Sequence, residues 1–139
     1  MSVLTPPLRE FLDSQIVGVM CTEPAGAHPL QSVVYYVRDD ERLLISSVVG
    51  RHKVGDVERG GWASLCVMGN ERPFPSATFS GRAEVLTENI GPATAALAQR
   101  FVGSEEAPQP QTDEALASVG RIIVAIAIER VAAVGHLDA

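Results

Sequence analysis

Short apolar segments separated by turn residues constrain the fold of this chain most strongly. Their length and their content of Val, Ile and Leu are typical of β-strands. The predicted strands cover residues 16–22, 33–37, 43–47, 62–68, 78–86 and 121–134. Because few long helices separate them, an antiparallel barrel is favoured over a doubly wound α/β sheet. We therefore expect a mainly β (α+β) fold with six antiparallel strands, in one domain that spans residues 1–139.

Short helices are predicted beside the strands. The first begins at Pro6, with Thr5 as its N-cap. A second, over residues 54–59, ends at a pair of glycines, and residues 93–101 have a helical composition. Residues 103–113 contain two prolines and are expected to form a flexible loop.

The last predicted strand, residues 121–134, is apolar on both faces. Ile122, Val124 and Ile126 alternate with Ile123 and Ala125, so neither face carries the polar side chains of an exposed surface. One face is expected to pack inside the barrel. The other face either meets a second copy of the chain or is enclosed within the same subunit.

The net charge of −6 bears on the possible partners. Proteins that bind nucleic acids or anionic membranes through their general surface need a basic surface, so neither partner is expected. No segment approaches the roughly 20 apolar residues of a membrane-spanning helix. A small anionic ligand held by a local basic cluster remains compatible with this charge.

Cys21 and Cys66 lie inside apolar segments, where buried free thiols are expected. No secretory signal is visible, and together these features predict a cytoplasmic protein. The three histidines form no pair at metal-ligand spacing, so no metal site is expected.

The segment over residues 43–53 carries the strongest chemical signal. A predicted strand ends in Ser46 and Ser47, a glycine follows, and Arg51, His52 and Lys53 stand at the start of a helix. Hydroxyl groups, helix N-terminal amides and cations together hold phosphate groups. The alternative interpretation is a solvated, charged turn without a ligand.

Three segments resemble the pyridoxamine 5′-phosphate oxidase-like FMN-binding split-barrel family. They are a strand, turn and strand over residues 20–36, the strand and basic turn over residues 45–53, and the strand over residues 79–85 with the closing strand 121–134. The resemblance implies a split β-barrel with short flanking helices. It also implies a homodimer with two cofactor sites at the interface between the subunits.

The same resemblance implies a set of cofactor-binding residues. They are Ser32, Val33, Val34, Tyr35, Ser46, Ser47, Arg51, His52, Lys53 and Ser76. Lys53 is expected to pair with the cofactor phosphate, assisted by Ser47. The backbone from Ser32 to Tyr35 is expected to border one side of the ring. The partner's segment before Phe79, which includes Ser76, is expected to border the other side. One of Tyr35 and Tyr36 is expected to face the core, and which of them does so is left open.

Departures from the family pattern predict a different activity from pyridoxamine phosphate oxidation. Gln31-Ser32 and His52-Lys53 stand where those oxidases usually have Arg and Arg-Lys, and a C-terminal substrate segment is not seen. The sequence looks more like the branch that uses the deazaflavin coenzyme F420, with FMN, or another group such as haem, as the alternative.

The predicted function is hydride transfer between this cofactor and a small organic substrate. The alternatives are a non-catalytic protein of the same fold that binds or carries the cofactor, and a structural barrel without ligand. No individual catalytic residue is predicted, because the cofactor supplies the redox chemistry.

Overall fold

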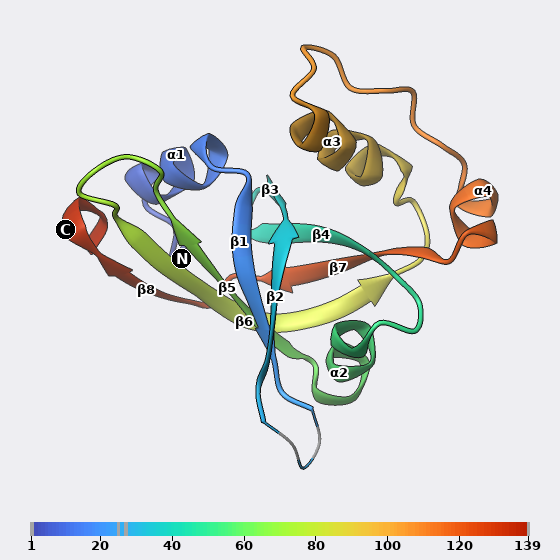
Figure 1. The fold of residues 1–139 in the computed structure, drawn as a ribbon, viewed down its shortest axis with the longest axis horizontal. Helices are drawn as coiled ribbons and strands as arrows, with labels where there is room; N and C mark the ends of the chain where they lie inside the picture. Colours follow the sequence, from blue (N-terminus) through green and yellow to red (C-terminus); the bar gives the residue numbers. More distant parts are fainter. Residues whose placement is uncertain (1, 25, 27, 139) are drawn as a thin grey trace.

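A computed structural model describes residues 2–24, 26 and 28–138 (Figure 1). The elements in chain order are α1 (Pro6–Ser14), β1 (Val17–Thr22), β2 (Leu30–Tyr35), β3 (Val37–Asp39), β4 (Arg42–Val48), α2 (His52–Gly60), β5 (Trp62–Met68), β6 (Ser76–Leu86), α3 (Gly91–Val102), α4 (Asp113–Ser118), β7 (Arg121–Ala127), β8 (Arg130–Val134) and the 3-10 helix η1 (Gly135–Asp138). The turn predicted near residues 24–29 includes Ala25 and Ala27, which lie outside the described residues.

The strands form an antiparallel split barrel, which confirms the predicted fold. Neighbouring strands follow the order β2-β1-β5-β6-β7-β4-β3, and β8 pairs with the first half of β6. Every strand pair is antiparallel. Within the described residues β2 pairs only with β1, so the barrel is open between β2 and β4.

The described residues contain eight strands instead of the six predicted, because two predicted strands each divide. The segment 33–37 divides at Tyr36, after which the chain leaves β1 and pairs with β4. The segment 121–134 divides at Ile128 and Glu129. The amide of Ile128 donates to the carbonyl of Glu41, and the amide of Glu129 donates to the carbonyl of Ser80, at 2.9 Å each. The chain therefore crosses from β4 to β6 at these two residues. Hydrophobic pattern alone does not show where a strand changes its partner.

Gly81 lies where β6 changes neighbours on one edge. Residues 76–80 pair with β8 and residues 83–86 with β7. A Cβ atom at Gly81 would overlap the carbonyl oxygen of Ala127, so the crossing of the chain at this point requires glycine.

Both faces of β7 are enclosed within the chain. Ile122, Val124 and Ile126 belong to the main core inside the barrel. On the other face, Ile123 and Ala125 form a second cluster. This cluster is completed by Leu44 of β4, Ile90 just before α3, Leu97 of α3 and Leu116 of α4. Of the two alternatives left by the sequence, enclosure within the chain is therefore correct.

The predicted helices are confirmed, and a fourth is added. The Thr5 hydroxyl accepts from the amide of Leu8 at 3.4 Å, as expected of an N-cap. Helix α2 ends at Gly60 and is capped by Gly61, whose φ of 69° is in the left-handed region. Helix α4 follows directly after the predicted loop, and Thr112 caps it. Its six residues are too short to give a clear periodic pattern. None of the helices in the described part of the chain is long and apolar enough to span a membrane.

The two tyrosines of the second predicted strand differ in their surroundings. Tyr36 is fully buried, and its hydroxyl donates to the carbonyl of Leu12 at 2.6 Å. Burial raises the pKa of Tyr36 above its ordinary value. Tyr35, the next residue toward the N-terminus, points to the outside and is 39% exposed. Tyr36 is therefore the core residue of the pair.

The two cysteines are free, as predicted, but they are not buried. Cys66 is exposed and Cys21 is partly exposed. Strand alternation explains the error, because Met20 and Leu65 occupy the inward positions beside them and are buried.

Candidate functional site

A pocket of about 520 Å³ lies at the opening of the barrel between β2 and β4. Helices α3 and α4, on the same side of the molecule in Figure 1, close it from outside. Its lining residues are Val33, Val34, Tyr35, Ser46, Lys53, Thr94, Leu97, Ala98, Phe101, Gln111, Leu116, Val119 and Arg121. This volume is within the usual range of sites for small organic ligands.

The unpaired edge of β2 forms one wall of the pocket. The amide of Tyr36 donates to Ile16 of the neighbouring chain segment, next to the paired residues Val17 and Tyr35. Hydrogen-bonding direction alternates along an antiparallel strand, so Val34 also faces β1. The amides and carbonyls of Val33 and Tyr35 consequently point toward the open edge. They are available to hydrogen-bond a flat polar ring.

Side chains of β2 and α3 make the wall apolar. Tyr35 and Phe101 meet edge to face, with their ring centroids 4.7 Å apart. Val33 and Phe101 are strongly exposed, at 76% and 63%. Exposed apolar side chains beside a pocket are typical of a surface that a ligand or a partner covers.

Two cations also line the pocket. Lys53 comes from the first turn of α2, and Arg121 from the start of β7. Arg121 donates from Nη1 to Ser46 Oγ at 3.2 Å. Among the ion pairs of the described residues, none includes Lys53 or Arg121. Partial burial lowers the pKa of Lys53 below its ordinary value, and the positive charge of the nearby Arg51 lowers it further.

The two cations make the pocket suitable for an anion. Lys53 is the only lysine of the sequence, and the protein as a whole is acidic. Two cations without a carboxylate partner, beside a serine hydroxyl, match the donors that bind phosphate groups. The pocket thus combines an apolar wall, hydrogen-bonding backbone and two cations.

The structure brings half of the predicted site residues together. Val33, Val34, Tyr35, Ser46 and Lys53 all line the pocket. The other five predicted residues do not line it. Their role in binding stays a prediction.

The reasons for their separation differ. Ser47 is 6% exposed and pairs with Ile122, so it faces the barrel interior while Ser46 faces the pocket. Arg51 and His52 are exposed at the start of α2. Ser32 and Ser76 are partly exposed, on β2 and at the start of β6.

Arg121 was missed by the sequence prediction, as were the contributions of α3 and α4. Its signal was present, because Arg121 is the charged residue that opens an otherwise apolar strand. Residues 94–101 and 111–119 carry no comparable pattern. Only the packing of α3 and α4 against β4 and β7 places them at the pocket.

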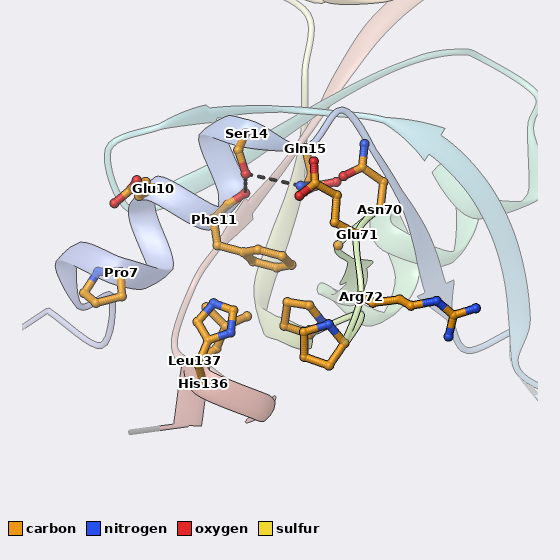
Figure 2. Close-up of a pocket in the computed structure, with 13 residues that line it drawn as sticks. Pro7, Glu10, Phe11, Ser14, Gln15, Asn70, Glu71, Arg72, His136 and Leu137 are labelled. Carbon is orange, nitrogen blue, oxygen red and sulfur yellow. Dashed lines mark hydrogen bonds between the residues drawn. The ribbon is translucent and has the colours of Figure 1, made fainter.

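A second cavity, of about 610 Å³, lies at the other end of the molecule between α1, the β5–β6 loop and η1 (Figure 2). Its lining includes Phe11, several prolines and Leu137, and also the charged or basic residues Glu10, Glu71, Arg72 and His136. Figure 2 shows Arg72 extending away from Phe11. Although this cavity is larger, its lining combines two carboxylates with Arg72 and His136, whereas the described residues that line the pocket beside Lys53 include two cations and no carboxylate. The pocket beside Lys53 is therefore the candidate site.

Comparisons with known proteins agree with this architecture. The sequence profile of the pyridoxamine 5′-phosphate oxidase family matches residues 4–135. No curated protein matches the chain.

Solved structures share the fold at low sequence identity. A conserved hypothetical protein of Mycobacterium tuberculosis has a TM-score of 0.76 and 20% identity, over 97% of this chain and 87% of the other. An F420 reductase has a TM-score of 0.74 and 16% identity, over 93% of this chain and 98% of the other. An FAD-binding protein of Mesorhizobium loti has a TM-score of 0.70 and 22% identity, over 94% of each chain. Given the profile match over nearly its whole length, the chain belongs to the pyridoxamine 5′-phosphate oxidase family.

Proposed function

We propose that this protein is an oxidoreductase that binds coenzyme F420, or alternatively FMN, in the pocket beside Lys53. The observation that carries the proposal is that Lys53 and Arg121 line the same pocket as the apolar side chains of β2 and α3. One F420 reductase and one FAD-binding protein among the solved structures share this fold, which supports the cofactor class.

The residues present fit such a cofactor. Lys53, Arg121 and the Ser46 hydroxyl offer donors for a phosphate group. The free edge of β2 offers amides and carbonyls for the polar edge of a ring, and Tyr35 and Phe101 cover its apolar surface. When bound, the cofactor supplies hydride transfer to or from a small organic substrate. The chain itself orients the ring and keeps water from it.

The charge around the pocket favours F420 over FMN in this proposal. F420 carries a phosphodiester and a polyglutamate tail, so it presents more negative charge than the single phosphate of FMN. Arg51 and His52 are exposed just outside the pocket, next to Lys53 in the sequence. They offer further donors along the path of an acidic tail.

Titration of the purified protein with F420 and, separately, with FMN tests the proposal through the fluorescence of the ligands. We expect saturable binding of both, with F420 tighter. Reoxidation of the reduced cofactor by a panel of unsaturated and quinone-type acceptors then tests for turnover. Binding without turnover by any acceptor supports the non-catalytic carrier, and binding of neither cofactor contradicts the proposal.

We further propose that the protein is a homodimer formed through the outer face of the sheet β2-β1-β5-β6-β8. The strand registers align one row of outward side chains across this sheet: Val33, Val19, Cys66, Thr78 and Ala132. A neighbouring row contains Tyr35, Val17, Met68, Ser76 and Val134. Neither row contains a charged residue, as is typical of the centre of an interface.

The face also connects the dimer to the cofactor site. Val33 and Tyr35, at one edge of the sheet, line the pocket, and Ser76 lies toward the opposite edge. A two-fold axis that runs parallel to the strands through the middle of the face brings opposite edges of the two copies together. Such a dimer agrees with the expectation that the partner's Ser76 approaches the ring.

Substitution of Cys66 by arginine tests the interface, because Cys66 is exposed at the middle of the row. We expect the wild type to sediment as a dimer and Cys66→Arg largely as a monomer, since an unpaired charge in an interface is strongly unfavourable. Val3→Arg is the matched control, because Val3 is 40% exposed and lies outside the sheet. A monomeric wild type, or a Cys66→Arg variant that dimerises as well as the control, contradicts this interface.

A further inference from the structure

A buried carboxylate lies one turn beyond Lys53 on the same helix. The Asp56 side chain is 2% exposed. Its Oδ2 accepts a hydrogen bond from Thr22 Oγ1 at 2.8 Å, and its Oδ1 pairs with Arg59. Since an unpaired buried carboxylate is costly, these two partners determine whether Asp56 is tolerated where it lies.

The Thr22 contact joins α2 to the barrel. Thr22 is the last residue of β1 and is itself buried. Strand β1 pairs along its length with β2, whose free edge forms the wall of the pocket. The hydrogen bond from Thr22 to Asp56 therefore fixes the helix that carries Lys53 relative to the strand that carries the wall.

The Arg59 contact determines which cation compensates the carboxylate. Lys53 and Arg59 stand three residues before and three residues after Asp56, and residues at this spacing are neighbours on a helix surface. The carboxylate pairs with Arg59, and no ion pair joins it to Lys53. With Thr22 on one oxygen and Arg59 on the other, each carboxylate oxygen of Asp56 has a partner.

We propose that Thr22, Asp56 and Arg59 are positioning residues that hold the first turn of α2 in place and keep the Lys53 ammonium free for an anionic group of the ligand. This inference rests on the proposed function for the identity of that ligand. The arrangement itself, in which Arg59 keeps the Asp56 carboxylate from Lys53, does not depend on it.

The first test uses the single lysine of the chain and needs no ligand. Because Lys53 is the only lysine, isotopic labelling of lysine gives one side-chain ammonium signal in NMR spectra, from which its pKa is measured. In Arg59→Gln the carboxylate of Asp56 loses its cation, and we expect it to pair with Lys53 and to raise the pKa of Lys53. Arg59→Lys restores a cation at this position and should return the wild-type value. An unchanged pKa in Arg59→Gln overturns the proposal.

The second test compares FMN with riboflavin, which lacks the phosphate. We expect Arg59→Gln and Thr22→Val each to weaken FMN binding on the order of tenfold, about the contribution of one charge-assisted hydrogen bond, with riboflavin binding unchanged. Equal losses for both ligands indicate general damage to the fold and overturn the positioning role. Thermal unfolding of the variants identifies any such damage directly.

The two tests separate this inference from the proposed function. If the wild type binds FMN no better than riboflavin, the assignment of Lys53 to a phosphate group fails. The pKa of Lys53 in Arg59→Gln still decides whether Arg59 keeps Asp56 from Lys53. If FMN is preferred but the variants bind both ligands like the wild type, the proposed function stands and this inference fails.

Discussion

Replacing Gly81 with alanine is expected to destabilise the protein by about 3 kcal/mol or more, the upper range for overpacking a well-packed site. The added Cβ overlaps the carbonyl oxygen of Ala127, and this neighbour is backbone that cannot rotate away. Hydrogen bonds from the amides of Ile128 and Glu129 hold the two residues that follow Ala127 in place. For a chain of this length we expect the Tm to fall by roughly 10 °C, measured by calorimetry at fixed protein concentration.

Gly60→Ala is the matched control for this substitution. Gly60 is the last residue of α2, and a Cβ placed there meets no atom within 4 Å. We expect an unchanged or slightly higher Tm, because alanine restricts the unfolded chain more than glycine does. If Gly81→Ala unfolds at the same temperature as this control, the close contact between Gly81 of β6 and Ala127 at the end of β7 is not required for the fold.

Replacing Lys53 with alanine is expected to weaken binding of F420 or FMN by about ten- to a hundredfold. The loss corresponds to one charge-assisted hydrogen bond to a phosphate, on the order of 1.5–3 kcal/mol. Arg121→Ala should have an effect of similar size, because Arg121 lines the same pocket. Fluorescence titration of the variants with both cofactors measures these losses.

Arg72→Ala is the control that discriminates between the two cavities. Arg72 lines the larger cavity of Figure 2, at the opposite end of the molecule. We expect its cofactor affinity to equal that of the wild type. The opposite result, in which Arg72→Ala loses affinity and Lys53→Ala does not, moves the cofactor to the larger cavity.

The pH dependence of binding provides a further check on Lys53. The pKa of this ammonium is lowered, so in the free protein it loses its proton at a lower pH than an exposed lysine does. An anionic ligand binds the protonated form, and its affinity should therefore fall as the pH rises through this lowered pKa. Lys53→Arg keeps the charge throughout this range and should remove the dependence. An identical pH profile in the wild type and in Lys53→Arg indicates that another group is titrating.

Lys53 also shows which kind of inference the sequence supports. Its position after two serines and a glycine, at the start of a helix, is a local pattern, and local patterns can be read from neighbouring residues. The structure places Lys53 and Ser46 at one pocket. Ser47 was also predicted there, but β4 turns it toward the barrel interior beside Ile122. The choice between adjacent serines depends on strand alternation, which the sequence shows only once the inward face is known.

The alternation of apolar residues, the turn residues and the helix caps determined the mainly β class, the flanking helices and the basic turn, because these features arise between residues close together in the chain. Tertiary structure alone decided where β6 exchanges β8 for β7, and that α3 and α4 enclose the second face of β7. It also brought Arg121 next to Ser46, 75 residues earlier in the chain. These decisions depend on contacts between distant segments, whose formation is governed by the burial of apolar surface in the whole chain and leaves no local pattern.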